Sequence, residues 1–324
     1  MYSIKIGIGH RSNFFILNLK YFFSQVLQII FLRGCNFHLS QFLHHIVNLV
    51  TKGVCMKIGL YASMFGKDKP PTLDSIESYI TCAYKLRLDL IDFRRDRGFD
   101  SKDPAYLFET KINCIRKGLS VGYLASIGHF SGSDDDLSEK VASAKEDVDV
   151  ALFLGAPMIR IFSGMLSDRK EQLREIKCFQ EIADYAATKG ITVGLQNHPS
   201  TGDDVIRIIQ ETDRPNFTFL LDTGQWLDAP MYNNGGAAPA DHPLYHYIAQ
   251  TASYASHVRA KFFKVDTGQE EYLDYERIVP TLVDAGFNGP LTVVFEGRDA
   301  NTCSDLDVIE LAATELRELS IRYS

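Results

Sequence analysis

The sequence predicts a (β/α)8 barrel. Short apolar runs typical of buried strands alternate with helix-like segments, and the repeat is about 33 residues long, as strand–helix units require. In the second half of the chain, each apolar run ends in polar, chemically capable residues. Catalytic groups of such barrels lie at the carboxyl ends of several strands. That is the pattern of four stretches: GLQNHP (194–199), LLDTGQW (220–226), HVRAKFFKVD (257–266) and TVVFEG (292–297).

Eight strand–helix units can be placed from Met56 onward. The predicted strands are 57–63, 88–94, 119–125, 157–163, 191–197, 217–222, 257–264 and 291–296. The predicted helices are 72–86, 104–117, 134–154, 168–189, 202–212, 242–254, 275–286 and 305–321. Because alternate residues of a barrel strand face the interior, each strand assigns its side chains either to the interior or to the helical layer.

Helical periodicity and glycine positions support these boundaries. Apolar residues recur at three- and four-residue spacing, as in Ile176 and Phe179, which is the period of a helix with one buried face. Gly190 and Gly286 stand where two helices should end, because glycine readily adopts the conformation that terminates helices. The long connection 227–243 is expected at the catalytic end, as a lid or a substrate wall.

Composition and charge are those of a globular protein with an acidic body. Of the 324 residues, 45% are hydrophobic and 23% are charged, and the net charge is −7. Residues 1–55 contain five Lys or Arg and no Asp or Glu, which leaves 29 basic and 41 acidic residues after them. Nucleic-acid-binding surfaces need clustered cations against phosphate, so the acidic body argues against a nucleic-acid partner. A small cationic pocket remains compatible with it.

Residues 1–55 differ from the rest of the chain and are interpreted as an N-terminal extension outside the core. A secretory signal would need a compact apolar stretch and a small-residue cleavage site. The longest apolar stretch, FFSQVLQIIFL (22–32), is interrupted by polar residues and too short to span a bilayer. A transit peptide would suit the lack of acid, but Arg and Ser are few. The remaining interpretation is a misassigned start upstream of Met56, with the barrel at 56–324.

Six scattered cysteines predict reduced thiols rather than a disulfide framework or a zinc site. They are Cys35, Cys55, Cys82, Cys114, Cys178 and Cys303. None belongs to a CxxC pair or to the spacing of a zinc knuckle. Reduced, mostly buried thiols are usual in the cytosol, so a cytoplasmic location with no membrane role for the core is expected.

The chain from Met56 to about Leu319 resembles the xylose isomerase-like TIM barrels, the superfamily of sugar-phosphate isomerases and epimerases that also contains endonuclease IV. The resemblance rests mainly on LGAPMIRIFSG, GITVGLQNHPSTGDDV, LLDTGQW, HVRAKFFKVD and EEYLDYERIVPTLVDAGFNGPLTVVFEGRD. It implies a small-molecule carbohydrate substrate. Typical members hold one divalent metal with four ligands, Glu, Asp, His and Glu, one from each of the last four strands.

This chain departs from that ligand pattern on three of the four strands. Gln196 replaces the first Glu, and Arg259 replaces the His, within VRAK where relatives have VHAK. Asp222 is kept, whereas Val294 stands at the last Glu position, with Glu296 one inward-facing step further along. A guanidinium cannot ligate a cation and repels it. No cofactor is therefore firmly implied; at most, Asp222 and Glu296 would bind one divalent ion (Mn, Mg, Co or Zn) weakly.

The candidate catalytic residues are Glu296 as base, Lys261 as the cation that stabilises developing negative charge, and His198. The candidate substrate-binding residues are Arg160, Gln196, Arg259, Gln225, Trp226 and His129. Structural alternatives stay open for each, such as a salt bridge to a carboxylate for Lys261, a helix cap for His198 or loop packing for Trp226.

The leading functional hypothesis is a sugar or sugar-phosphate isomerase or epimerase that transfers a proton through an enediolate. The alternative is a non-catalytic or lyase-like barrel that binds an acidic sugar or a sugar phosphate through Arg160, Arg259 and Lys261. DNA repair of the endonuclease IV kind would need many more His and carboxylate ligands at the strand ends. The sequence leaves substrate identity, stereochemistry and homo-oligomerisation open.

Overall fold

The structure of the protein is a computed structural model. It describes residues 56–63, 72–95, 99, 102–126, 128–163, 168–233 and 235–323. Eight parallel strands form a closed barrel in sequence order, in which the last strand pairs with the first. They are β1 (Ile58–Tyr61), β2 (Leu90–Arg94), β3 (Ser120–Ala125), β4 (Met158–Phe162), β5 (Thr192–Gln196), β6 (Phe217–Asp222), β7 (Ala255–Phe262) and β8 (Leu291–Phe295). The predicted (β/α)8 barrel is thus confirmed.

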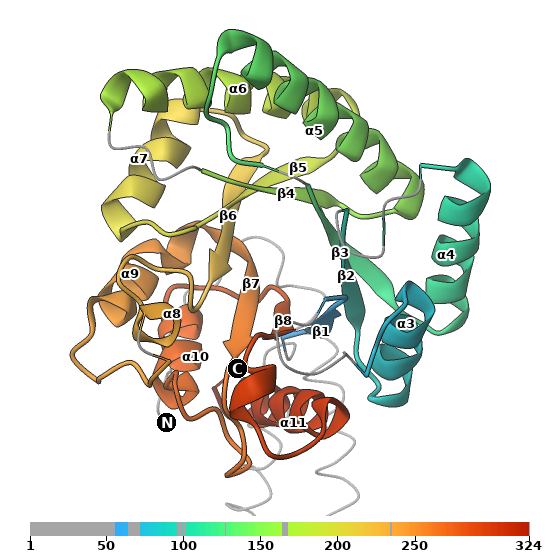
Figure 1. Cartoon of the computed structure of the whole chain (residues 1–324), viewed down its shortest axis with the longest axis vertical. Coiled ribbons are helices and arrows are strands. Elements are labelled where there is room, and N and C mark those ends of the chain that lie inside the picture. Colours follow the sequence, from blue (N-terminus) through green and yellow to red (C-terminus); the bar gives the residue numbers. More distant parts are fainter. Residues whose placement is uncertain are drawn as a thin grey trace, which may run out of the picture. The chain divides into compact units, whose positions relative to one another are not determined.

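The helices lie outside the strands, and α11 packs against both β8 and β1 where the barrel closes (Figure 1). The main helices are α3 (Ile76–Lys85), α4 (Pro104–Arg116), α5 (Asp134–Leu154), α6 (Arg169–Thr188), α7 (Gly202–Thr212), α9 (Pro243–Thr251), α10 (Tyr275–Asp284) and α11 (Asp305–Tyr323). Three short helices lie in the connections: α8 (Pro230–Asn233), η1 (Ala252–Tyr254) and η2 (Arg298–Ala300).

Each predicted strand and helix has an observed counterpart, with small differences at the ends. The first helix begins at Ile76 rather than at residue 72, because Ser75 accepts a hydrogen bond from the backbone of Ser78 and caps it there. Strand β7 begins at Ala255, two residues earlier than predicted. The long connection 227–243 contains the short helix α8. The predicted extension 1–55 lies outside the described residues.

Local sequence signals account for several helix ends. Ser133 caps α5 by accepting from the backbone of Asp136, whose carboxylate accepts in return from the Ser133 backbone. Thr201 caps α7 in the same way, so both helices start with a capping box. Gly190 (φ 69°) and Gly286 (φ 83°) follow α6 and α10 in the left-handed conformation, as the sequence predicts.

The core has two parts because the barrel has an outside and an inside. Apolar side chains of the strands and helices fill the outer layer, where Phe179 of α6 and Leu316 of α11 are fully buried. A small apolar cluster lies apart from that layer and consists of Tyr61, Tyr123, Ala125, Met158, Leu220 and Val294. The inward face of β7 instead carries three polar side chains, His257, Arg259 and Lys261, all buried.

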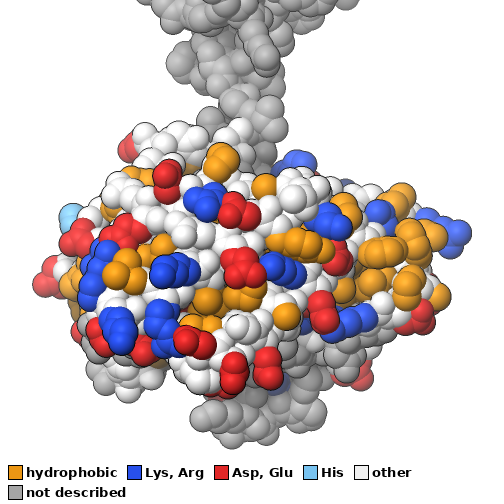
Figure 2. Space-filling model, turned by 90° about the horizontal axis from the view of Figure 1, so that it is seen from above, with side chains coloured by type: hydrophobic (Ala, Val, Ile, Leu, Met, Phe, Trp, Pro, Cys, Tyr) orange, Lys and Arg blue, Asp and Glu red, His pale blue; other side chains and the backbone are white. Residues whose placement is uncertain are grey.

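On the face of the molecule seen in Figure 2, acidic and basic side chains are interspersed. Ion pairs such as Arg174–Asp134 and Lys145–Glu181 join the neighbouring helices α5 and α6. No helix of the described part is long and apolar enough to cross a membrane. The four cysteines in the described part are free thiols, and of these only Cys303 is not buried.

Two buried carboxyl groups organise the segment that follows β7. Glu270 accepts hydrogen bonds from the backbone of Phe263 (2.7 Å) and Tyr272 (3.0 Å), and Glu315 of α11 accepts from the Glu270 backbone (2.9 Å). Burial raises the pKa of Glu270 from 4.5 to about 8 and that of Glu315 to about 7. The folded protein therefore keeps protons on these groups that the unfolded chain has lost at neutral pH.

We expect Glu270 and Glu315 to reduce the stability of the protein as pH rises from about 5 to about 8. At these two groups the folded state binds more protons than the unfolded state in this range, so each carboxyl lowers the free energy of unfolding by up to about 1.4 kcal/mol per pH unit. Thermal unfolding between pH 5 and 9 measures the slope, which should become smaller in Glu315→Gln. The exposed Glu139→Gln on α5 is the control, and an equal slope in wild type and Glu315→Gln would contradict the assignment.

Candidate active site at the barrel mouth

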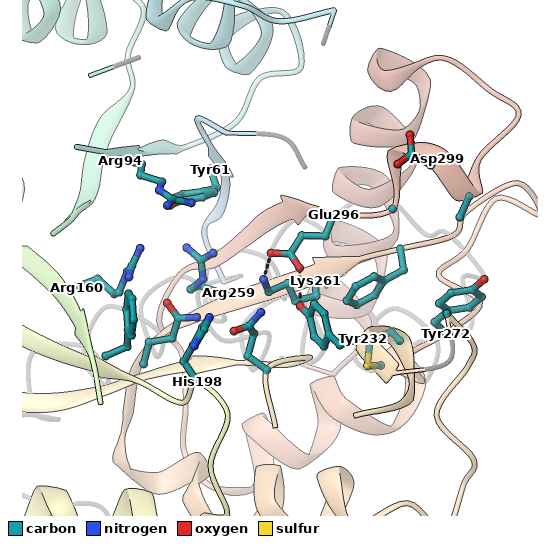
Figure 3. Close-up of a pocket in the computed structure, with 18 residues that line it drawn as sticks. Tyr61, Arg94, Arg160, His198, Tyr232, Arg259, Lys261, Tyr272, Glu296 and Asp299 are labelled. Atoms are coloured by element: carbon teal, nitrogen blue, oxygen red, sulfur yellow. Dashed lines mark hydrogen bonds and ion pairs between the residues drawn. The ribbon is translucent and has the colours of Figure 1, made fainter. Parts of the chain in front are cut away.

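A cavity of about 670 Å³ opens at the carboxyl ends of the strands. It is lined by Tyr61, Arg94, Arg160, Phe162, Gln196, His198, Gln225, Met231, Tyr232, Gly235, Arg259, Lys261, Phe263, Tyr272, Glu296, Gly297, Asp299 and Ala300 (Figure 3). This volume suits a small-molecule ligand. The lining is rich in cations and in hydrogen-bonding groups, which suits a polar ligand.

The carboxylate of Asp222, at the end of β6, lies beneath this cavity and is fully buried. Its Oδ2 accepts from Gln196 Nε2 (3.0 Å) and Arg259 Nε (3.0 Å), and Lys261 Nζ lies 3.4 Å away. Its Oδ1 accepts from the backbone of Gly224 (3.0 Å) and Gln225 (3.1 Å). Both oxygens are therefore committed to donors of the protein.

Arg259 is held from several sides at the centre of the barrel. Besides its ion pair with Asp222, the guanidinium donates to the Tyr123 hydroxyl and lies 4.2 Å from the ring centroid of Tyr61. A cation over an aromatic face is stabilised electrostatically. Arg259 is thus held in a fixed position and also lines the cavity.

Lys261 lies between the buried carboxylate of Asp222 and the cavity. Its ammonium group lies between Asp222 Oδ2 and the carboxylate of Glu296, with which it forms a close ion pair (Figure 3). The other oxygen of Glu296 accepts from the Tyr232 hydroxyl at 2.5 Å. Burial of the hydroxyl raises the pKa of Tyr232 well above its usual 10, so the group stays a donor at neutral pH.

Hydrogen bonds between side chains and the backbone fix the strand ends that carry these residues. The Asn197 side chain donates to the Asp222 carbonyl (2.9 Å) and accepts from its N–H (2.8 Å), so it bridges β5 and β6 as a strand residue would. Thr223 Oγ1 accepts from the Lys261 backbone (2.9 Å) and contacts the Tyr275 hydroxyl (3.0 Å). The three strand ends are thereby locked in register.

A second wall of the cavity combines aromatic and basic groups. The rings of Phe162 and His198 lie 4.8 Å apart, and His129 packs edge-on against Phe162 at 4.4 Å. Burial lowers the pKa of His198 to about 4 and also lowers that of His129, so both imidazoles are neutral at pH 7. Arg160 lies over the Phe162 ring at 4.9 Å.

The structure brings most of the predicted site residues together. Those that line the cavity are Glu296, Lys261, His198, Arg160, Gln196, Arg259 and Gln225. Asp222 lies behind the lining and touches four of them, namely Gln196, Arg259, Lys261 and the backbone of Gln225. The substrate-contacting roles of all these residues remain predictions.

Two predicted substrate-binding residues lie outside the lining. Trp226, only 1% exposed, packs against Phe219 (6.2 Å between ring centroids) and Tyr247 (5.7 Å), so its indole belongs to the hydrophobic core. Its bulk fills the space between β6 and α9 instead of offering a platform to a sugar. His129 reaches the site only through its contacts with Phe162 and His198.

Sequence reasoning did not single out Tyr61, Arg94 and Tyr232, which also line the cavity. Tyr61 and Arg94 are the last residues of β1 and β2, so position at a strand end was a usable signal for both. Tyr232 belongs to α8 within the long connection that follows β6. The connection was predicted as a substrate wall, but no pattern distinguished this tyrosine within it.

The residues present do not fit a divalent metal ion. A metal needs carboxylate oxygens with free lone pairs, whereas Asp222 and Glu296 already accept from Arg259, Lys261 and Tyr232. Two of these donors are cations, which would repel a metal. Within the described part of the chain, no three His, Cys, Asp or Glu side chains are grouped as metal ligands would be.

Comparison with known proteins identifies the family. The profile of the family described as "Xylose isomerase-like TIM barrel" matches residues 85–319, more than half of the chain, so this protein belongs to that family. A comparison with curated proteins found no match.

Several solved structures share the fold. An L-ribulose 3-epimerase is 16% identical with a TM-score of 0.63, and the match covers 82% of this chain and 95% of that one. A D-psicose 3-epimerase from Clostridium cellulolyticum H10, solved with D-tagatose, is 16% identical with a TM-score of 0.61, covering 83% and 96%. A xylose isomerase domain protein from Planctomyces limnophilus is 18% identical with a TM-score of 0.60, covering 82% and 97%.

We expect Asp222→Asn to lower the free energy of unfolding by about 3–5 kcal/mol, because it leaves Arg259 buried without a carboxylate and Lys261 with Glu296 alone. Thermal or denaturant unfolding measures the loss. The matched control is Asp184→Asn, which breaks an exposed pair with Arg214 and should change the melting temperature little. Equal melting temperatures for the two variants would show that Asp222 does not hold the buried cations in place.

We expect protein purified without chelator to carry well under one tightly bound divalent ion per chain, because cations already occupy the positions around Asp222 and Glu296. Elemental analysis by mass spectrometry measures the content after gel filtration. Stoichiometric Mn, Mg, Co or Zn would contradict this expectation, and a loss of that metal in Asp222→Asn would locate it.

Proposed function

We propose that this protein is a carbohydrate isomerase or epimerase that moves a proton at a carbon next to a carbonyl group. The Lys261–Glu296 ion pair at the cavity surface carries the proposal. It presents a carboxylate and an ammonium side by side, which are the base and the electrostatic group that such a reaction needs.

In the proposed reaction, Glu296 takes the proton from the carbon beside the carbonyl. The C–H electron pair becomes the carbon–carbon double bond of an enediolate, and the carbonyl oxygen gains negative charge. Lys261 and Arg259 lie where they can stabilise that oxygen, since both line the cavity. Return of the proton from Glu296 to the neighbouring carbon of the enediolate, while the hydroxyl proton of that carbon passes to the former carbonyl oxygen, gives the isomer. For the epimer, a water molecule donates a proton to the opposite face of the original carbon, and Glu296 gives the proton that it took to the resulting hydroxide.

The positive charge that stabilises the enediolate comes, in this proposal, from the protein itself. Arg259 and Lys261 are rigidly placed by Asp222, so they need little reorganisation when charge develops. Preorganised charges of this kind in a water-poor site are among the largest contributors to catalysis. Neutral His198 and the amide of Gln196 are proposed to hydrogen-bond sugar hydroxyls.

The relatives support the substrate class. The solved structures with the same fold include an L-ribulose 3-epimerase and a D-psicose 3-epimerase with D-tagatose. Both reactions invert a carbon next to a ketose carbonyl, which is the chemistry proposed here. Identity below 20% supports no choice among individual sugars.

A second candidate is a barrel that binds an acidic sugar or a sugar phosphate without isomerising it. The observation that favours it is Arg160, a buried cation in the cavity wall whose Nε has no hydrogen-bond partner. Binding of such a ligand without proton exchange would establish this alternative over the first.

We expect the protein to exchange the hydrogen beside a ketose carbonyl with solvent. Incubation in D2O with pentuloses, hexuloses and their phosphates, followed by proton NMR, detects this exchange without knowledge of the product. In the same assay, Glu296→Gln should lower kcat by about 10²–10⁴, because the base is lost. Lys261→Met should lower kcat by about 10²–10³ and weaken binding as well.

The control variant is Glu139→Gln, which makes the same change on the exposed face of α5 and should leave the rate unchanged. A Glu296→Gln protein that exchanges deuterium at the wild-type rate would end the proposal. Exchange that is absent with every sugar tested would favour the binding alternative.

A further inference from the structure

The part of the chain that the structure describes contains four buried arginines, and one of them differs from the others. Arg95 pairs with Asp147 at 2.8 Å, Arg259 with Asp222 at 3.0 Å, and Arg298 with Asp305 at 3.2 Å. Arg160 is 5% exposed and has no ion pair with any described residue. Its Nε lacks a hydrogen-bond partner.

The surroundings of Arg160 add positive charge instead of neutralising it. Arg94 and Arg259 line the same cavity and, after burial itself, help to lower the pKa of Arg160. No carboxylate is among the groups that act on it most strongly. A buried charge without a partner is costly, so a protein keeps one where a ligand supplies the missing charge.

A second buried polar atom in the same wall also lacks a partner. His198 Nδ1 forms no hydrogen bond with any described residue. The His198 ring lines the cavity beside Phe162. The guanidinium of Arg160 lies in the same wall, over the ring of Phe162. Arg160 Nε and His198 Nδ1, which both lack a hydrogen-bond partner, therefore lie in one compact region of the cavity surface.

This region is opposite the reacting pair. Arg160 is on β4 and Glu296 follows β8, and strands four apart face each other across a closed barrel of eight. Figure 3 shows Arg160 and Arg94 on one side of the cavity and Glu296 with Lys261 on the other. A ligand that reaches both sides must span the mouth of the barrel.

We propose that Arg160, with His198 beside it, forms a subsite for an anionic group at the end of the substrate remote from its carbonyl. The anion is a phosphate ester or a carboxylate, because both match the planar donor array of a guanidinium. The position of the substrate carbonyl rests on the proposed function, whereas the assignment of the anion subsite does not. The substrate class is thus a ketose that carries a terminal phosphate or a terminal carboxylate.

The test measures binding to the Glu296→Gln protein by isothermal titration calorimetry, so that its outcome does not depend on turnover. The probes are D-fructose 6-phosphate, D-fructose 1-phosphate, the ketose acid D-tagaturonate and neutral D-fructose. We expect at least one probe with a terminal anion to bind at least about 10-fold more tightly than D-fructose, since a charge-assisted contact to a buried cation is strong. D-Fructose 1-phosphate should bind more weakly than the 6-phosphate, because its charge lies beside the carbonyl.

The result with each probe decides the source of the anion. Tight binding of the 6-phosphate alone identifies a phosphate subsite, and tight binding of the uronate alone identifies a carboxylate subsite. Equal affinity of all probes, including D-fructose, overturns the proposal. Failure of deuterium exchange alongside selective anion binding would refute the isomerase and leave the subsite intact.

Two further variants separate a ligand-binding arginine from a structural one. Arg160→Met should remove the preference for anionic probes, and Arg160→Lys should retain part of it. Without ligand, Arg160→Met should melt at the same temperature as the parent or higher, because it removes an uncompensated charge. Arg95→Met should melt more than about 5 °C lower, because it strands Asp147. A comparable loss in Arg160→Met, with anion binding unchanged, would overturn the proposal.

Discussion

The buried carboxylate of Asp222 is the interaction on which the barrel mouth depends. Inside a barrel, a positive charge is costly unless it is paired and hydrogen-bonded. Asp222 meets that condition for Arg259 and Lys261 at once, while its second oxygen accepts from two backbone N–H groups. Because Lys261 also contacts Glu296, a continuous chain of ion pairs connects buried Asp222 to the surface of the cavity.

The fold could be predicted from sequence because two periodicities and a few end signals agree along the chain. Apolar strands alternate with helices of period 3.6, and Gly190 and Gly286 end helices in the conformation that glycine favours. The start of the first helix was misplaced because Ser75, rather than an earlier residue, supplies the cap. Such a choice depends on competing hydrogen bonds, which composition and periodicity do not resolve.

The convergence of side chains at strand ends could also be predicted, since strand alternation and barrel closure fix which way Arg259, Lys261 and Gln196 point. Trp226 shows the limit of this reasoning. It lies four residues after the end of β6, yet its indole turns into the core, and only packing against α9 decides that direction. Tyr232 was missed for the converse reason, because a loop residue reaches the site through the path of the loop and not through any period.

Glycine at position 297 restricts how this site can change over evolution. A Cβ there would lie 1.6 Å from the carbonyl oxygen of Phe263, so the chains that leave β7 and β8 touch backbone to backbone. Any other residue would force the two segments apart and carry Glu296 away from Lys261. Mutational drift can therefore reshape the wall of the cavity, at positions such as Gln225 or Tyr232, far more readily than it can relocate the carboxylate. New ligand preferences would arise around a carboxylate whose position is sterically fixed.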